Sequence, residues 1–317
     1  MKILAMSNFI PEEICDTVRF TQYSGERNIS HYCGYASDFI SQALQDNSVD
    51  GIVFPKTCDS TRIIGSYLEM SNKFLYQIHI PSILSLISGG GASYFASEIK
   101  QYKEAIERFF NISISDEQIQ NRIDLLNQRN SKLCNLYENI EQFSYSQYLK
   151  LIHETLQKPL SEQEIIPERL RESKVGKRIF LIGSFLSNLK ILDVIENNGL
   201  QVIGDFLPES GRLVSKKDVA AAAATDIYTE IAQNILSQKP SPSQNCYKEV
   251  LTSIFDEIRH KNVQGVIFIT QQYCEAYDYL YYAIKKSMNI PMIQVALNGT
   301  DDDGKASIIL EAFADMI

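Results

Sequence analysis

Short runs of β-branched and aromatic residues, each followed by a helical pattern, constrain the fold of this chain most strongly. These runs occupy residues 2–6, 18–23, 51–55, 74–81, 178–184, 200–205, 265–270 and 290–295. Between most of them, apolar residues recur at three- and four-residue spacing, which is typical of amphipathic helices. Strands that alternate with helices favour a parallel sheet, because each crossover returns the chain to the same end of the sheet. The sequence therefore predicts an α/β protein.

The middle of the chain has a different pattern. From about residue 92 to 172, charged residues are dense and apolar residues keep helical spacing, so we interpret this stretch as a helical insertion. A chain of 317 residues is long for a single hydrophobic core. We expect two doubly wound domains: an N-terminal domain at 1–172 that carries the insertion, and a C-terminal domain at 173–317.

Charge and hydrophobicity argue against two kinds of partner. The formal net charge is −9 at pH 7, whereas nucleic-acid binding needs a basic face. No apolar run reaches the roughly 18 residues of a membrane-spanning helix. The apolar segment at the N-terminus is too short for a signal peptide. We expect a cytoplasmic protein that binds neither nucleic acid nor a membrane.

Two distant segments share one local order. Residues 49–62 read VDGIVFPKTCDSTR, and residues 263–276 read VQGVIFITQQYCEA. Each contains a glycine, a run typical of a buried strand, and then a cysteine followed by a carboxylate. In open α/β sheets, ligands bind beyond the carboxyl ends of the strands. Cys58 and Cys274 are therefore expected at ligand-binding edges.

The chain has six cysteines, and none of them form a C-x-x-C pair. Disulfides are rare in cytosolic proteins, and the spacing does not support a zinc ribbon or a thioredoxin site. Cys33, Cys58 and Cys274 each precede a predicted helix, whose N–H groups and dipole favour a thiolate. Cys15 and Cys134 lie inside helical patterns and are expected in the core.

Two interpretations of these three cysteines stay open at this point. They are either small buried side chains, as free cysteines often are, or ligands of one iron–sulfur cluster. Three thiolates on a [4Fe-4S] cluster would leave one iron open to a solvent or substrate oxygen.

Five motifs occur in order along the chain: SNFIPEEI at 7–14, HYCGYASDFI at 31–40, FPKTCDSTR at 54–62, GVIFITQQYCEAYDY at 265–279 and EAFADM at 311–316. In these motifs the chain resembles the 2-hydroxyacyl-CoA dehydratase D-component family, which includes the class I benzoyl-CoA reductase subunits. The resemblance implies two flavodoxin-like domains with a [4Fe-4S] cluster at their interface. It gives the ligand role to Cys33, Cys58 and Cys274.

The resemblance also implies a function. Enzymes of this family pair two related subunits, so we expect a heterodimer or a homodimer. An ATP-dependent iron–sulfur activator protein supplies an energised electron, which passes through the cluster to an acyl-CoA substrate. A hydroxyl group then leaves as water, or an aromatic ring is reduced. The chain is thus expected to be the iron–sulfur subunit of an anaerobic radical dehydratase or a related reductase.

Some positions depart from the family pattern and favour an alternative. Pro208 stands where the family often has a cysteine, and Ile308 and Ile309 replace a Thr-Arg pair. The alternative is a non-catalytic electron-relay or scaffold subunit of such a complex. A third hypothesis is a two-domain protein that binds a small molecule without a metal, although the two Cys–acid motifs argue against it.

Three further residues are candidates for the site. Glu13 follows Pro11 and either stabilises a helix N-terminus or moves a proton near the cluster. His31, two residues before Cys33, is either a surface or core histidine or a proton donor. Ser184 ends the run at 178–184 and is expected to contact a ligand in the second-domain cleft.

Overall fold

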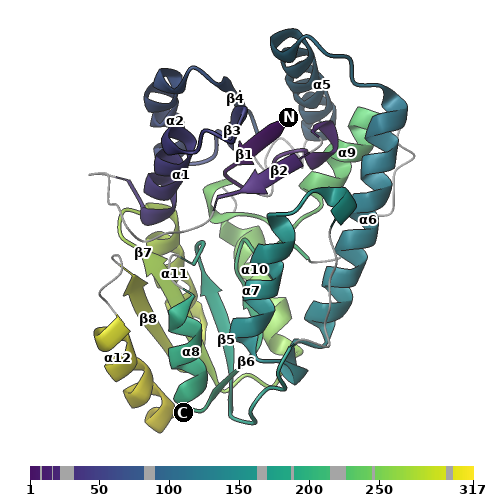
Figure 1. The fold of residues 1–317 in the computed structure, drawn as a ribbon. Coiled ribbons are helices and arrows are strands. Elements are labelled where there is room, and N and C mark those ends of the chain that lie inside the picture. Colours follow the sequence, from purple (N-terminus) through teal and green to yellow (C-terminus); the bar gives the residue numbers. More distant parts are fainter. Residues whose placement is uncertain are drawn as a thin grey trace.

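The computed structural model describes residues 1–7, 9–15, 17–21, 32–81, 90–162, 170–186, 189–214, 226–244, 247–297 and 303–317. The described strands form two four-stranded sheets, and every strand pair is parallel. Figure 1 shows the first sheet above the second. These findings confirm the prediction of an α/β fold with parallel sheets.

The two sheets have the same strand order. The first is ordered β2-β1-β3-β4 and the second β6-β5-β7-β8. The strands of the first are β1 (Lys2–Ala5), β2 (Thr17–Phe20), β3 (Gly51–Pro55) and β4 (Phe74–Ile78). Those of the second are β5 (Lys177–Gly183), β6 (Leu200–Phe206), β7 (Gly265–Gln271) and β8 (Met292–Leu297). This arrangement is consistent with two Rossmann- or flavodoxin-like units, which reverse their strand order next to the first strand.

Apolar side chains cover both faces of each sheet. Along β1, Ile3 and Ala5 enter one hydrophobic cluster, whereas Leu4 enters another. Along β5, Leu181 belongs to the first cluster and Phe180 to a third. Alternate strand residues point to opposite faces, so these clusters lie on opposite sides of the sheets. The first cluster contains residues of both sheets and joins the two halves of the chain.

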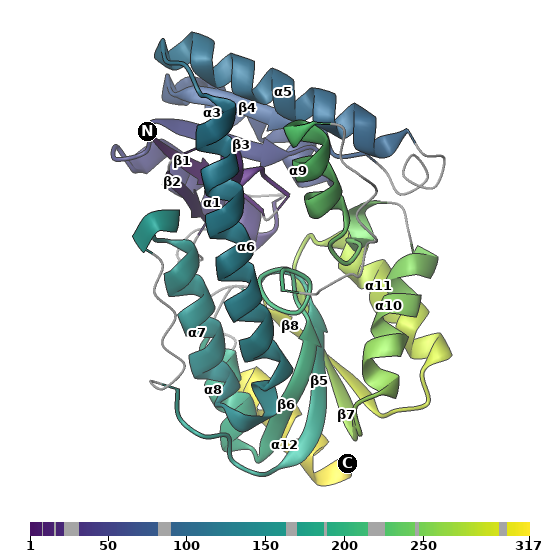
Figure 2. The same cartoon turned by 90° about the vertical axis from the view of Figure 1, so that its right-hand side faces the viewer.

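The predicted insertion is helical. Its helices are α5 (Gly91–Phe110), α6 (Asp116–Glu138) and α7 (Tyr145–Leu156). Ser115 caps α6 by accepting a hydrogen bond from the Gln118 N–H at 3.2 Å. Helix α6 runs beside both sheets (Figures 1 and 2).

Helices also connect the two halves. Helix α9 (Ile227–Leu236) comes from the second half but packs against α5 (Figure 2). Helix α7 of the insertion packs against α8 (Lys190–Asn197). The domain boundary at 172/173 stays a prediction.

The remaining helices lie near the sheets. They are α1 (Gly34–Gln45), α2 (Asp59–Ile63), α3 (Gly65–Leu68), α10 (Tyr247–Arg259), α11 (Glu275–Ser287) and α12 (Asp303–Met316). Among the residues that the structure describes, none of the helices is long and apolar enough to cross a membrane.

The sequence patterns at 11–18 and 60–71 each predict a helix, and both predictions need correction. In the described part of 11–18 the helix is reduced to one 3₁₀ turn, Glu12–Ile14, because the chain is extended at Cys15 and β2 begins at Thr17. The helix predicted at 60–71 is broken into α2, α3 and a 3₁₀ turn. It ends at Asn72, whose φ of 56° is left-handed.

Candidate functional site

Three cysteines occupy the same local position in the fold. Cys33 is the N-cap of α1, Cys58 that of α2, and Cys274 that of α11. The prediction that each precedes a helix is confirmed. Cys58 and Cys274 follow β3 and β7, so they stand at the carboxyl ends of central strands of the two sheets.

Local hydrogen bonds fix the backbone at Cys58. The Thr61 hydroxyl oxygen accepts from the Cys58 N–H at 3.0 Å and from the Thr57 N–H at 3.1 Å. The same hydroxyl donates to the Cys58 carbonyl oxygen at 2.9 Å. Thr61 therefore closes the turn that presents the thiol of Cys58.

The backbone before Cys274 is strained. Tyr273 has a φ of 65°, a left-handed conformation that is unfavourable for an aromatic residue. The turn is closed by the Cys274 N–H, which donates to the Gln271 carbonyl oxygen at 3.1 Å. Such strain persists only where the surrounding structure enforces it, and it is concentrated at functional sites.

All three cysteines line one cavity of about 110 Å³, which we call the cysteine cavity. Pro55 and Gln271, the last residues of β3 and β7, also line it. The cavity therefore lies where the carboxyl ends of the two sheets meet. A single water needs only about 10–15 Å³, so this space is large enough for a bulkier group.

The thiols of the cysteine cavity are buried and interact with one another. The pKa of Cys33 is raised to about 11, mainly by burial and in smaller part by the nearby Cys58. The N–H groups of Ala36 and Tyr35 lower it, but by less than burial raises it. Burial also raises the pKa of Cys274 well above its ordinary value, and Cys33 and Cys58 add to this rise. The helix N-termini alone do not make these thiols anionic.

The arrangement of these groups bears on which ligand they could hold. Within the described residues, no group of three or more His, Cys, Asp or Glu side chains is arranged to hold a single metal ion. In an iron–sulfur cluster each thiolate binds a different iron, so the ligands stand farther apart. Three thiols around one cavity could each bind a different iron of such a cluster.

The other predicted residues lie in different places. Ser184 lines the cysteine cavity, and its buried hydroxyl has no hydrogen-bond partner among the described residues. Glu13 is buried in the 3₁₀ turn and is not among the residues that line the cavity. Burial raises the pKa of Glu13 to about 8. His31 lies outside the described residues.

Sequence reasoning did not single out Arg212 and Tyr277, which also line the cavity. Arg212 is only 2% exposed, and its Nη1 donates to the Tyr277 hydroxyl at 3.0 Å. A positive charge at the wall of a low-dielectric cavity attracts a ligand atom that carries negative charge. The ESGR segment that contains Arg212 was a sequence signal for this site.

Asp205, at the end of β6, shapes the loop that carries Arg212. Its Oδ1 accepts from the N–H groups of Leu207 at 2.9 Å and Gly211 at 2.7 Å. Its Oδ2 accepts from the Ser210 hydroxyl at 2.6 Å. A Cβ atom at Gly211 would stand 2.2 Å from the Asp205 carbonyl oxygen, so only glycine fits there. The loop as folded brings Arg212 to the cavity.

Gln271 connects the two halves of the site. Its Oε1 accepts from the Tyr35 N–H at 3.1 Å, and its Nε2 donates to the Phe185 carbonyl oxygen. The rings of Tyr35 and Phe185 are stacked, with centroids 3.9 Å apart and planes within 3°. Tyr35 is two residues after Cys33, and Gln271 is three before Cys274. One buried amide thus links the segments that carry two of the cysteines.

Comparison with known proteins assigns the family. The family described as 2-hydroxyglutaryl-CoA dehydratase, D-component, matches residues 3–317. The chain belongs to this family. The resemblance seen in the sequence motifs is therefore confirmed.

Two characterised relatives are similar along most of their length. The (R)-phenyllactyl-CoA dehydratase beta subunit of Clostridium sporogenes is 20% identical, over 90% of this chain and 80% of the relative. The (R)-2-hydroxyglutaryl-CoA dehydratase subunit beta of Acidaminococcus fermentans is 22% identical, over 93% of this chain and 83% of the relative. Both relatives are subunits of acyl-CoA dehydratases.

Similarity to solved structures is weak. A GTP-binding protein from Sulfolobus solfataricus in complex with GDP aligns over 100% of both chains at 13% identity. The TM-score of 0.25 is too low to indicate a shared fold.

Proposed function

We propose that this chain is the iron–sulfur subunit of an anaerobic radical 2-hydroxyacyl-CoA dehydratase, or of a related acyl-CoA reductase. The observation that carries the proposal is the cysteine cavity. Three N-cap cysteines from both halves of the chain line it, at the edge where α/β sheets bind their ligands. The family and both characterised relatives agree with an acyl-CoA dehydratase component.

The residues present fit a [4Fe-4S] cluster. Cys33, Cys58 and Cys274 would hold it, and the cavity offers several times the volume that a water needs. When bound, such a cluster supplies one electron at low potential and one iron without a protein thiolate.

The protein's own groups around the cavity suit a thioester substrate. An added electron places negative charge on the thioester oxygen, and the buried Arg212 guanidinium would stabilise that charge. The buried Ser184 hydroxyl can donate a hydrogen bond to a substrate oxygen. Apolar side chains such as Phe9 and Phe185 exclude water from the same cavity.

We expect two protein partners. Both relatives are beta subunits, so a partner subunit is implied, and we propose that it is a related chain. The second partner is an ATP-dependent iron–sulfur activator protein that delivers the electron. Glu13 and His31 stay candidates for proton transfer.

The proposal is tested by assembling the chain with its partner and activator under anaerobic conditions. Elimination of water from a 2-hydroxyacyl-CoA is followed by chromatography of the enoyl-CoA product, with benzoyl-CoA reduction assayed in parallel. We expect turnover of one substrate class and its loss in Arg212→Met, with iron content unchanged. Absence of turnover on both classes, in a complex that contains full iron, would contradict a catalytic role.

One observation favours a second candidate function. Pro208, which stands where the family often has a cysteine, lines the cysteine cavity itself. A chain altered at this position could serve as an electron-relay or scaffold subunit whose partner binds the substrate. Calorimetry of acyl-CoA with the isolated chain separates the two: binding supports the catalytic role, and binding by the partner alone supports the relay role.

A further inference from the structure

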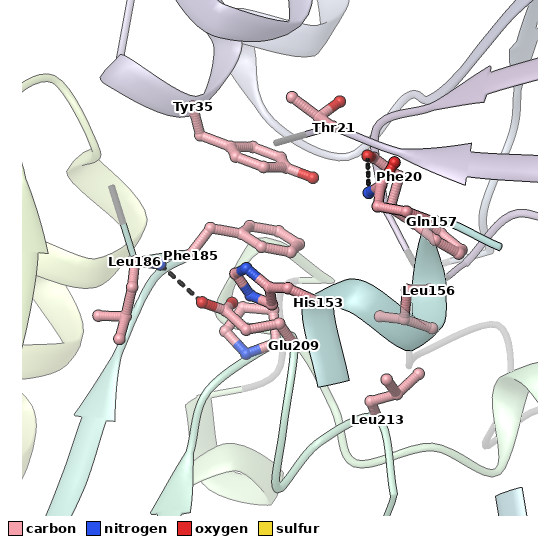
Figure 3. Close-up of a pocket in the computed structure, with 11 residues that line it drawn as sticks. Phe20, Thr21, Tyr35, His153, Leu156, Gln157, Phe185, Leu186, Glu209 and Leu213 are labelled. Carbon is pink, nitrogen blue, oxygen red and sulfur yellow. Dashed lines mark hydrogen bonds between the residues drawn. The ribbon is translucent and has the colours of Figure 1, made fainter. Parts of the chain in front are cut away.

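A second, smaller pocket, drawn in Figure 3, shares lining residues with the cysteine cavity. It has a volume of about 40 Å³. Tyr35, Phe185 and Pro208 line both spaces and form the wall between them. The rings of Tyr35 and Phe185 are stacked on one another within this wall. A group in the second pocket is therefore one side-chain layer from the cysteine cavity.

Glu209 is a buried acid in this pocket. Its Oε1 accepts from the Leu186 N–H at 2.8 Å, as Figure 3 shows. Its Oε2 is buried and has no hydrogen-bond partner among the described residues. Burial raises the pKa of Glu209 to about 8; the charge of Asp205 acts in the same direction and Arg212 in the opposite one. The carboxyl group therefore carries a proton at neutral pH.

The same pocket contains a neutral histidine. His153, on α7, lines it together with Thr21 and Gln157. Burial lowers the pKa of His153 to about 4, so at neutral pH its ring both donates and accepts hydrogen bonds. At about 10–15 Å³ per water, the pocket has room for roughly three waters among polar partners. Thr21, Gln157, His153 and Glu209 are the side chains of the lining that can hydrogen-bond such waters.

We propose that the second pocket is a proton store for the cysteine cavity, in which Glu209 holds the proton and exchanges it with solvent through water and His153. The role as supplier to the cysteine cavity rests on the proposed function. The buried acid and the pocket beside it do not depend on that function.

The proposed chemistry consumes the stored proton. Loss of a substrate hydroxyl breaks a C–O bond; the oxygen leaves with the bonding pair and needs one proton to become water. The O–H bond of Glu209 breaks and supplies this proton to the leaving oxygen. The resulting carboxylate regains a proton from water beside His153. Ring reduction would draw on the same store, because each added electron pair also needs protons.

The first experiment uses the isolated chain without cluster or substrate. Glu209→Gln keeps a carbonyl oxygen for the Leu186 N–H but has no acid proton, so it preserves the loop. Infrared difference spectra should show a protonated carboxylic acid at neutral pH that titrates near pH 8 and is missing in Glu209→Gln. Glu13→Gln is the matched control, because it removes another buried carboxyl whose pKa is also raised to about 8. An ionised Glu209 at neutral pH would overturn the proposal.

The exchange path is tested on the same signal. In heavy water the acid band shifts as its proton is replaced by deuterium. We expect at least a tenfold slower shift in His153→Leu than in the native chain. Equal exchange in the two proteins would remove His153 from the relay.

The second experiment uses the assembled enzyme. Glu209→Gln should lower kcat by about 10²-fold or more, as loss of a general acid does, with KM and iron content unchanged. Native turnover by Glu209→Gln would overturn the role as proton supplier. If the native complex has no turnover, the proposed function fails, and the infrared spectra still decide whether Glu209 stores a proton.

Discussion

Glu12 and Glu13 are neighbours in sequence whose surroundings give them opposite properties. Glu12 forms a bidentate ion pair with Arg129, at 2.7 and 2.8 Å, and both side chains are buried. Burial raises the pKa of Glu13 to about 8, and the charge of Arg129 offsets only part of that rise. Glu12 is thus suited to fixing α6 against the N-terminal turn, and Glu13 is suited to holding a proton.

Removing one partner of the buried ion pair should destabilise the protein strongly. We expect Arg129→Met to lower the free energy of unfolding by about 3–5 kcal/mol, because Glu12 is left as an uncompensated buried charge. Urea unfolding followed by circular dichroism measures this. The double variant Glu12→Leu with Arg129→Met should recover most of the loss, and equal stability of the single and double variants would refute the explanation.

The raised pKa of Glu13 predicts a dependence of stability on pH. Between pH 4.5 and 8 the unfolded chain has released this proton, whereas the folded chain retains it. The free energy of unfolding should therefore fall as pH rises through this window, by up to about 1.4 kcal/mol per pH unit, and level off above pH 8.

Two variants separate the contributions to this slope. Glu13→Gln should reduce this slope by up to the contribution of one proton, about 1.4 kcal/mol per pH unit. Glu209→Gln should reduce it by a similar amount, since the pKa of Glu209 is also raised to about 8. Urea titrations at several pH values measure the slope. A slope that is identical in the native chain and both variants would contradict the raised pKa values of Glu13 and Glu209.

At the scale of elements, the site depends on how loops and helix starts are tied together. Gln271 connects β7 to the start of α1 and to the segment after β5. Asp205 holds the loop after β6 through three accepted hydrogen bonds. Both side chains are buried, so water cannot replace the bonds that they make.

Gln271→Leu should loosen the link between the two halves. It removes the Gln271 acceptor of the Tyr35 N–H and the Gln271 donor to the Phe185 carbonyl oxygen, at a cost of up to roughly 1–3 kcal/mol for each buried group. The spacing of Cys33 and Cys274 should change as well. Crosslinking of these thiols by reagents of graded length should therefore show a broader length preference in Gln271→Leu. An unchanged preference would mean that Gln271 does not position the cysteines.

Asp205→Ala should disrupt the loop that carries Arg212. Three buried donors lose their acceptor, so we expect the free energy of unfolding to fall by roughly 3 kcal/mol or more. Asp205→Asn is the matched control, because its amide oxygen can still accept from Leu207 and Gly211. Differential scanning calorimetry compares the two; equal destabilisation would point to the charge of Asp205 instead of its acceptor geometry.

The sequence predicted much of this architecture because the main signals are local. Apolar runs identified the strands, and a cysteine before each helical pattern identified the three N-caps. The packing of helix α9 against α5 was not predicted, since the two helices lie more than a hundred residues apart in the sequence. The second pocket could also not be predicted from the sequence, because Thr21, His153 and Glu209 share no motif and meet only in the folded chain.

At the scale of the whole molecule, the cysteine cavity exists only because two similar halves meet at the carboxyl ends of their sheets. Cys33 and Cys58 come from the first half and Cys274 from the second. A hydrophobic cluster continuous through both sheets holds the halves together. The central claim is therefore that these three thiols act as one ligand set.

The most direct test of that claim is to count iron and sulfide per chain after anaerobic purification, alongside the low-temperature electron paramagnetic resonance spectrum. The native chain should contain about four irons and four sulfides. Cys33→Ser, Cys58→Ser and Cys274→Ser should each lose iron or change the spectrum, whereas Cys134→Ser, buried in α6 outside the cavity, should match the native chain. A native chain without iron, or three cavity variants that keep the native iron content and spectrum, would contradict the account.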